Sequence, residues 1–277
     1  MLVDKPAGIT SHDVVATVRR RFKTKAVGHT GTLDPFATGL LVMVLGGATR
    51  LARFVEAERK TYWAVARLGQ ATETDDPTGG PMGPAWGGEW PVPGAVDAAL
   101  RALEGPGMQR PPVFSAKSVD GVRSYALARR GEAVALEPVA VLVERLELLA
   151  YAPPLVTFRA TVGAGTYIRA IARDLGERLG TAGHLESLRR EAVGRFTVAE
   201  AVPLDRLTGG ETLIPPVDLL PFDRVEVTAE EAAQLRLGQR VGSAGTGMAA
   251  LVHDGALVAV GEGRDGRWQP VVVPAAA

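Results

Sequence analysis

Apolar residues recur along the first two hundred positions in two different spacings, which predict a mixture of strands and helices. Residues 40–45 form a short apolar run that ends at Gly46 and Gly47, as expected for a buried strand. Residues 62–68 alternate between apolar and polar side chains, which is typical of a half-buried strand. Two longer strand-like runs cover residues 139–149 and 155–162.

Helical spacing is found in three other stretches. Thr10, with Asp13 three positions later, resembles a capping box that opens the first helix. The third helix is closed by Gly180 in the C-cap position. The apolar stripes of the three helices are Val14, Val18 and Phe22; Val96, Leu100 and Leu103; and Ile168, Ile171, Leu175 and Leu179.

Strands and helices follow one another without strict alternation, which predicts an α+β fold around a mainly antiparallel sheet. Prolines at positions 203, 215, 216 and 221 indicate a connecting stretch, and a compact pattern of short strands with one short helix follows from Phe222. We therefore expect a large domain over residues 1–220 and a small second domain over residues 221–277. A loop rich in Gly, Pro and Trp, residues 77–93, is expected to be exposed; its part 83–90 matches no motif that we can assign.

The composition supports a folded globular chain. Of the 277 residues 46% are apolar, and no run approaches the roughly 18 apolar residues of a membrane span. The first residues also lack the layout of a secretory signal, so we expect a cytoplasmic protein. Because cysteine is absent and the four histidines are not spaced like a ligand pair, we expect neither thiolate chemistry nor a bound metal.

Cations gather in clusters although the formal net charge is zero. The first cluster contains three consecutive arginines, Arg19 to Arg21, with Lys23 and Lys25; the others are Arg129 with Arg130, and Arg189 and Arg190 with Arg195. Such clusters bind nucleic-acid phosphates or simply form solvated helix faces. Taken singly, each cluster is better interpreted as a solvated face.

The most informative segment is residues 28–41, in which a single carboxylate, Asp34, lies among glycines, hydroxyl groups and Pro35 just before the first buried strand. Spacing alone favours a turn in which Asp34 caps neighbouring amides. No phosphate-binding loop, metal-binding helix or cysteine nucleophile offers a competing chemistry.

The amino-acid sequence of residues 28–41 closely resembles the signature of the TruB family of pseudouridine synthases. Similar matches cover residues 1–200 in order, including residues 111–117 and 121–125, which resemble the RNA-gripping insertion of bacterial members (about 105–135). The other motifs are Asp4, Lys5, Pro6 and Gly8; Lys60, Thr61 and Tyr62; Gly165, Thr166, Tyr167, Ile168 and Arg169; and Leu188, Arg189 and Arg190.

The resemblance implies an isomerase that converts uridine 55 in the T-loop of transfer RNA to pseudouridine by flipping the base, without a cofactor. It also implies a pseudouridine synthase fold with a C-terminal, mostly-β, PUA-like RNA-binding domain. The catalytic residues implied are Asp34, Arg169 and Tyr62. The residues implied to contact the substrate are His29, Tyr167, Leu188, Lys5, Arg123 and Arg190, with Arg129 and Arg130 as further phosphate contacts.

Two alternatives remain at the sequence level. One is a guide-RNA-dependent relative, which usually lacks the insertion found here. The other is a non-catalytic transfer RNA-binding or folding protein, whose simplest mark would be a lost carboxylate. For the favoured interpretation transfer RNA is the expected partner, with no obligate protein partner, and we expect a monomer because no heptad seam is visible.

Overall fold

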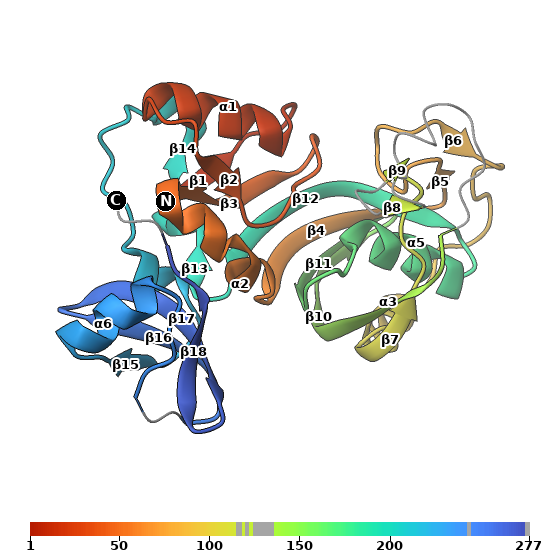
Figure 1. Cartoon of the computed structure of the whole chain (residues 1–277). Helices are drawn as coiled ribbons and strands as arrows, with labels where there is room; N and C mark the ends of the chain where they lie inside the picture. The colour runs from red at the N-terminus through yellow and green to blue at the C-terminus, as the bar shows by residue number, and fades with distance from the viewer. Residues whose placement is uncertain (115–117, 120–121, 124–135, 243–244, 275–277) are drawn as a thin grey trace. The chain divides into compact units, whose positions relative to one another are not determined.

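The computed structural model describes residues 1–114, 118–119, 122–123, 136–242 and 245–274 (Figure 1). The chain divides into two compact units. The first unit contains Met1–Pro35, Gly39–Glu58 and Val193–Ala277, and the second contains Phe36–Thr38 and Arg59–Ala192. Among the described residues, no helix is long and apolar enough to cross a membrane.

The N-terminal part of the first unit combines short strands with one longer helix. Its sheet has the order β14-β1-β3, in which β1 is parallel to β14 and antiparallel to β3, and β2 pairs with the far end of β3. The elements are β1 (Leu2–Lys5), α1 (Ser11–Arg21), β2 (Val27–His29), β3 (Thr38–Leu45), η1 (Gly46–Leu51), α2 (Ala52–Glu56), β13 (Phe196–Thr197), η2 (Val198–Glu200), β14 (Val202–Pro203), η3 (Leu204–Arg206) and η4 (Pro216–Leu219).

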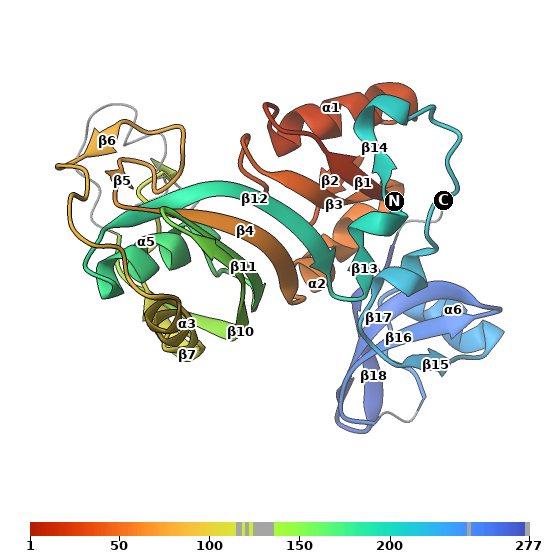
Figure 2. The same ribbon diagram turned by 180° about the vertical axis from the view of Figure 1, so that it is seen from behind.

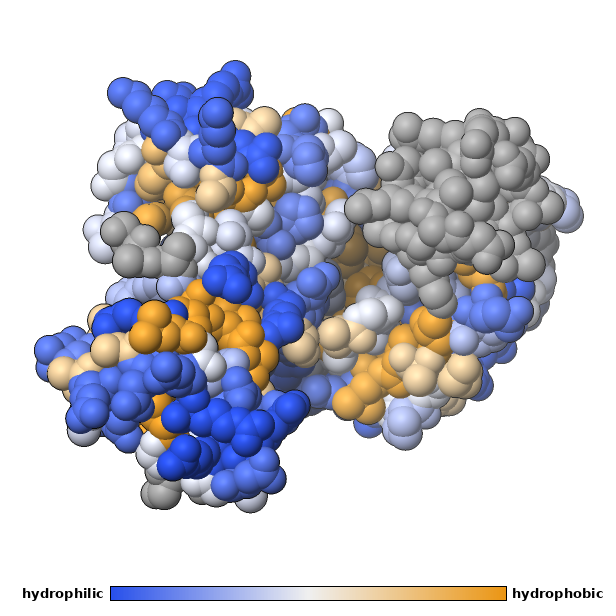
Figure 3. Space-filling view, in the orientation of Figure 1, coloured by the Kyte–Doolittle hydropathy of each residue, from blue (hydrophilic) through white to orange (hydrophobic). Residues whose placement is uncertain are grey.

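Helix α1 begins as the sequence predicts. The hydroxyl of Thr10 accepts a hydrogen bond from the Asp13 amide at 3.1 Å, and the Asp13 carboxylate accepts one from the Thr10 amide at 2.8 Å. The Thr10 hydroxyl also donates to the Asp13 carboxylate at 2.6 Å, and this bond, together with the one from the Thr10 amide, holds the pKa of the Asp13 carboxyl below its usual value. Val14 and Val18 are fully buried, whereas hydrophilic side chains gather on the outer surface over α1 (Figure 3).

Strand β3 is buried on both faces, which explains its unbroken apolar run. Leu41 and Met43 pack in one hydrophobic cluster with α1, whereas Leu40, Val42 and Val44 pack in another. The interpretation of residues 40–45 as a buried strand is therefore confirmed.

The C-terminal segment of the first unit forms a four-stranded sheet in the order β15-β16-β17-β18, with α6 against β16 and β17 (Figure 2). Strands β15 and β16 are parallel and the other neighbours are antiparallel. The elements are β15 (Arg224–Glu226), α6 (Ala229–Arg236), β16 (Gly247–His253), β17 (Ala256–Arg264) and β18 (Arg267–Val272).

The second unit contains a longer set of strands in the order β12-β4-β11-β10-β7, in which the pairs β4-β11, β11-β10 and β10-β7 are antiparallel. Its two described helices, α3 and α5, contact each other. The elements are β4 (Lys60–Leu68), β5 (Ala71–Thr72), β6 (Pro81–Met82), α3 (Pro93–Arg101), β7 (Gly105–Gln109), β8 (Ser118–Val119), β9 (Val122–Arg123), β10 (Val139–Ala152), β11 (Leu155–Val162), α5 (Ile168–Arg178) and β12 (Gly183–Val193).

These elements confirm the predicted α+β fold with mainly antiparallel pairing. Two details differ from the sequence interpretation. Helix α5 has Leu179 as its C-cap, so Gly180 stands one position later, where its φ of +71° suits a glycine. The stretch around Leu188 proves to be part of a long strand, β12.

Candidate active site

The loop that carries Asp34 is held on both sides of the aspartate. The Ser11 hydroxyl accepts a hydrogen bond from the Leu33 amide at 2.9 Å and donates one to the Leu33 carbonyl at 3.1 Å. On the other side, the Pro35 carbonyl accepts a bond from the Gly8 amide at 2.8 Å. Asp34 itself is half-buried. The two anchors hold the backbone on either side of Asp34.

Lys5 is a buried cation that binds backbone carbonyls. Its Nζ donates to Ile9 O at 2.7 Å, to Pro6 O at 3.0 Å and to Pro35 O at 3.3 Å, and the residue is 0% exposed. Gly8 has a φ of +86°, a conformation that L side chains rarely adopt, so the turn between Lys5 and α1 favours glycine. The first sequence motif therefore builds the support under the Asp34 loop.

Arg169 lies on the first turn of α5 in the second unit and is 5% exposed. Its Nη1 donates to Thr74 O at 2.8 Å and to the Asp76 carboxylate at 3.3 Å, and its Nη2 donates to Phe114 O at 2.8 Å. The guanidinium is thus fixed in position by two loops, residues 72–78 and 110–114. A buried cation held in this way can orient and stabilise a carboxylate, because its planar donors are already aligned.

Asp76 is the residue of this network that the sequence did not indicate. It is 4% exposed, and its Oδ1 accepts bonds from the Thr74 hydroxyl at 2.6 Å and the Thr78 amide at 2.9 Å. Its other oxygen pairs with Arg169. The only signal in the sequence is its setting, an acid flanked by threonines and glycines in an otherwise exposed loop, which is shared by many turns.

One helical turn after Arg169, a second arginine holds the same loop. Arg173 contacts the Asp75 carboxylate at 2.8 Å. Burial raises the pKa of the Asp75 carboxyl, and the charge of Arg173 offsets part of this rise. The pair borders a cavity of about 460 Å³ whose wall includes Met82, Pro111 and Val113.

The predicted aromatic residues lie on different elements of the second unit. Tyr62 is the third residue of β4 and is 7% exposed, opposite Ala160 of β11. Tyr167 is the N-cap of α5, and Gln109 brackets its backbone through bonds of 2.8 Å to the amide and 3.1 Å to the carbonyl. Leu188 is a 7% exposed residue of β12.

The remaining predicted residues differ in their surroundings. His29 ends β2 and is half-buried. Arg190 is only 1% exposed, so a contact from its side chain to RNA would have to be made inside the protein rather than on the outer surface. The backbone of Arg123 pairs with Ser118 in the β8-β9 hairpin. Arg129 and Arg130 lie outside the described residues.

The predicted site residues divide between the two units. Lys5, His29 and Asp34 belong to the first unit, and Tyr62, Arg123, Tyr167, Arg169, Leu188 and Arg190 belong to the second. The first unit thus provides a carboxylate in a loop anchored on both sides, and the second provides a guanidinium held by hydrogen bonds together with the buried side chains of Tyr62 and Leu188.

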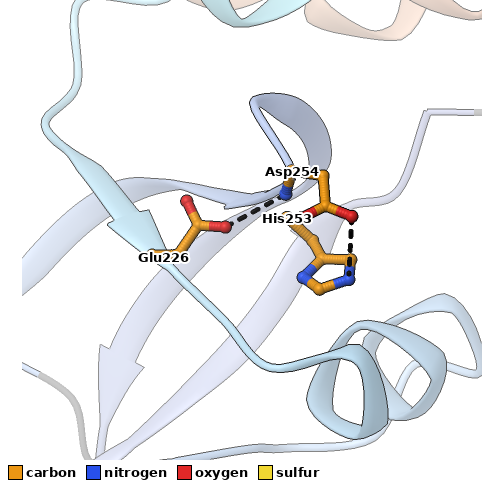
Figure 4. Close-up of side chains that lie close together, drawn as sticks. All are labelled: Glu226, His253 and Asp254. Atoms are coloured by element: carbon orange, nitrogen blue, oxygen red, sulfur yellow. Dashed lines mark hydrogen bonds and ion pairs between the residues drawn. The ribbon is translucent and has the colours of Figure 1, made fainter.

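Among the described residues, one group has the side-chain types that bind metal ions: Glu226, His253 and Asp254 (Figure 4). Their ligand atoms lie within 4.8 Å of one another. However, the Glu226 carboxylate accepts the Asp254 amide at 3.0 Å, and His253 Nδ1 contacts Val227 O at 2.9 Å. These contacts stabilise the turn between β16 and β17, and they explain the group without a metal.

Nearly the whole chain matches known family models. Residues 19–168 match the family described as TruB family pseudouridylate synthase (N terminal domain). Residues 169–213 match the tRNA pseudouridylate synthase B C-terminal domain, and residues 222–275 match tRNA Pseudouridine synthase II, C terminal.

Curated proteins match over a similar extent. The tRNA pseudouridine synthase B of Thermobifida fusca (strain YX) is 44% identical over 287 aligned positions, which cover 99% of this chain and 97% of that protein. The protein of the same name from Solibacter usitatus (strain Ellin6076) is 43% identical over 277 positions, covering 95% of this chain and 94% of that protein.

Solved structures show the same fold. A chain in the crystal structure of a Cbf5-Nop10-Gar1 complex aligns with a TM-score of 0.71 and 26% identity, covering 94% of this chain and 76% of that one. A chain in the structure of an H/ACA RNP bound to a substrate RNA containing 2′-deoxyuridine aligns with a TM-score of 0.72 and 23% identity, covering 98% of this chain and 83% of that one. At this identity the second match bears on the fold alone.

Proposed function

Because this chain belongs to the TruB family of pseudouridylate synthases, we propose that it isomerises uridine 55 in the T-loop of transfer RNA to pseudouridine. The observation that carries the proposal is the 44% identity, over 99% of the chain, to a protein named tRNA pseudouridine synthase B. The anchored position of Asp34 supports it, because the reaction needs a carboxylate held in one orientation.

The reaction breaks the bond between ribose C1′ and uracil N1, turns the base, and joins C1′ to C5. The proton on C5 leaves and N1 gains one, so atoms and electrons balance without an oxidant, a reductant or a cofactor. Asp34 is the proposed nucleophile or base in this exchange.

Arg169 is proposed to pair with Asp34 when RNA closes the site. A carboxylate that loses water becomes harder to ionise, and a neighbouring guanidinium counters this effect. The bonds from Arg169 to Thr74 and Asp76 would keep its donors aimed in one direction, which favours the charged form of Asp34 at little cost in reorganisation.

The target uridine is stacked within a folded loop, so it has to be flipped out at a cost of a few kcal/mol. We propose that Tyr62 stacks on the flipped uracil and that Tyr167 and Leu188 line the pocket. His29 would occupy the space that the base vacates. Lys5 contributes indirectly by supporting the Asp34 loop from below.

The remaining contacts are proposed to follow the RNA backbone. Arg123 and Arg190, the insertion at about residues 105–135 and a C-terminal PUA-like domain at residues 221–277 would hold the T-arm. We propose that the protein works in the cytoplasm as a monomer, on a catalytic domain of residues 1–220.

Release of tritium from transfer RNA labelled at uracil C5 tests the function. The native chain should release tritium, and Asp34→Asn should release none, because an amide is neither a nucleophile nor a base here. RNA with cytidine in place of uridine 55 should also give none. As a control for the loss of a negative charge, Asp97→Asn on α3 should keep full activity. No release from the native chain would refute the proposal, and release that persists with cytidine at position 55 would place the target elsewhere.

The same assay addresses the alternatives. The solved structures with this fold include H/ACA complexes, and a guide-dependent relative would need a guide RNA. Release from bare transfer RNA, with no other RNA or protein present, would exclude that requirement. A protein that binds and refolds transfer RNA without any release would be a non-catalytic binding protein.

A further inference from the structure

An exposed group of five cations lies at the C-terminal end of α1. It consists of Arg19, Arg20, Arg21, Lys23 and Lys25, and we call it the α1 basic cluster. The opposite side of the helix packs Val14 and Val18 into the core, so the arginines face outward. The cluster lies within the hydrophilic surface over α1 that Figure 3 shows.

These cations have no carboxylate partner among the described residues, whereas many arginines elsewhere in the described chain have one. Arg19 Nη2 donates to Val27 O at 3.2 Å, and Arg20 Nη2 donates to the Thr17 hydroxyl at 3.3 Å. Elsewhere guanidinium groups form ion pairs, as in Arg67 with Glu186 at 2.8 Å. Because the formal net charge of the chain is zero, the unpaired cations form a local positive surplus.

An acidic residue in the loop next to the end of α1 does not neutralise this surplus. The loop at Gly209 approaches the end of α1 so closely that an added Cβ would lie 2.2 Å from Arg21 O. In this loop Glu211 accepts bonds from the amides of Thr208 and Gly209 at 2.6 and 2.9 Å, which lower its pKa to about 2. Its carboxylate therefore caps the backbone donors of Thr208 and Gly209.

The backbone conformation of Lys23 is one that glycine adopts more easily than lysine. Its φ is +51°, directly after the C-cap residue Phe22, where glycine is usually found. A non-glycine residue in this left-handed region is less stable by roughly 1 kcal/mol. A lysine at this position contributes charge at the expense of stability, as expected if the charge has a use.

The cluster is connected directly to the Asp34 loop. Arg19 is bonded to β2, and β2 ends at His29, which leads into the loop. Lys25 and Asp34 are nine positions apart in the chain, which limits the distance between them to about 30 Å. RNA whose uridine reaches Asp34 has backbone phosphates within that range.

From these observations we propose that the α1 basic cluster is a docking surface for the phosphodiester backbone of the transfer RNA. The inference rests on the proposed function for the identity of the RNA. Its rival is a purely structural role, since cations near a helix C-terminus complement the helix dipole. The two roles predict different effects when the cations are replaced by neutral residues. Docking predicts a change in RNA affinity and in its salt dependence, whereas the structural role predicts a change in thermal stability.

The test compares two triple variants that lose the same charge. Arg20→Gln, Arg21→Gln and Lys23→Gln are combined in one protein. The control combines Arg101→Gln, Arg145→Gln and Arg178→Gln, which lie exposed in the second unit. The dissociation constant for unmodified transfer RNA is measured between about 50 and 300 mM KCl, since each phosphate contact contributes about 0.7–0.9 to the slope of log K against log salt.

The cluster variant should show a slope that is shallower by about 2 to 3 and an affinity that is 10- to 100-fold lower at about 0.1 M salt. The loss should appear in KM rather than in kcat. The control should retain the native slope. A cluster variant with the native slope and affinity would overturn the inference, as would an equal loss in both variants.

Lys23→Gly separates charge from fold. This variant should melt at the native temperature or above, because glycine suits the left-handed conformation, yet bind transfer RNA about 5- to 10-fold more weakly at about 0.1 M salt. Native affinity in Lys23→Gly would count against the inference. Failure of the proposed function is seen separately, as absence of tritium release from the native chain while the salt slopes are still measurable.

Discussion

At the scale of single residues, the candidate site depends on backbone anchors as much as on reactive groups. Ser11 and Gly8 hold the residues on either side of Asp34, and Lys5 holds one of them again. Asp76 likewise helps to hold Arg169 in position, by accepting a hydrogen bond from its guanidinium. A carboxylate and a guanidinium that are each fixed beforehand lose little entropy when they meet a substrate.

Replacement of Asp76 by asparagine should slow the reaction while RNA binding is retained. The amide keeps one acceptor oxygen for Thr74 and Thr78, but it removes the charge that faces Arg169 and can turn an NH₂ group toward it. We expect the single-turnover rate to fall by about 10- to 100-fold, equivalent to about 1.4–2.7 kcal/mol, and the dissociation constant of transfer RNA to change less than about twofold.

Asp97→Asn is the matched control for this change, since Asp97 is paired with Arg101 on the surface of α3. It should leave both quantities unchanged. If Asp76→Asn reacts at the native rate, Arg169 does not depend on Asp76 for its orientation.

Sequence reasoning found Asp34 through the wording of a motif, and it could not have found Asp76 in the same way. An acid among threonines and glycines is an ordinary turn by composition. Two properties distinguish Asp76: only 4% of its surface is exposed, and it pairs with Arg169, which is 93 positions away. Both properties exist only after folding.

At the scale of elements, α5 fits against the start of β12 through a glycine. An added Cβ on Gly176 would lie 2.3 Å from the carbonyl carbon of Ala182 and 2.4 Å from the amide nitrogen of Gly183. These are backbone atoms, which cannot rotate away as a side chain can. The close contact fixes the position of the helix that carries Arg169.

Gly176→Ala should therefore destabilise the protein, although alanine favours helices by about 1 kcal/mol over glycine. The clash costs about 2–4 kcal/mol, so it outweighs the propensity. Gly94→Ala on α3 is the matched control, because nothing lies within 4 Å of its Cβ position. We expect a lower melting temperature for the first variant and an equal or higher one for the second, measured by circular dichroism. An unchanged melting temperature in Gly176→Ala would mean that the helix can move at no cost.

Local pattern predicted the elements whose own residues decide their structure. The capping box at Thr10 and the alternation in residues 155–162 are examples. Strand β12 was missed because its apolar residues Leu185 and Leu188 are spaced as in a helix. Its polar residues are accommodated by pairs with neighbouring strands, such as Arg67 with Glu186 at 2.8 Å, and a single segment gives no sign of such pairs.

At the scale of the whole molecule, the first unit joins segments from the two ends of the chain. Leu51, Val217 and Leu220 pack in one hydrophobic cluster with residues of the C-terminal sheet, among them Val252 and Val260. The sequence predicted a small second domain over residues 221–277 on the basis of prolines and a change of pattern, and this boundary stays a prediction. Contacts between residues about two hundred positions apart leave no periodic signal, so the shared core could not be predicted.

Removal of residues 221–277 should therefore destabilise what remains of the first unit. The deletion would expose Leu51, Val217 and Leu220, whose exposed fractions in the intact protein are 8% or less, at a cost of about 1.5–3 kcal/mol per side chain. It would also remove Phe222, whose ring contacts that of Phe54 at 5.2 Å. The combined loss is comparable to the whole stability of a typical domain, about 5–15 kcal/mol.

A chain of residues 1–220 should thus unfold at a much lower temperature, or aggregate, when its melting is followed by circular dichroism and light scattering. If instead it melts cooperatively at the native temperature, the C-terminal segment is an independent domain whose contacts with Leu51 and Leu220 contribute nothing to the stability of the rest.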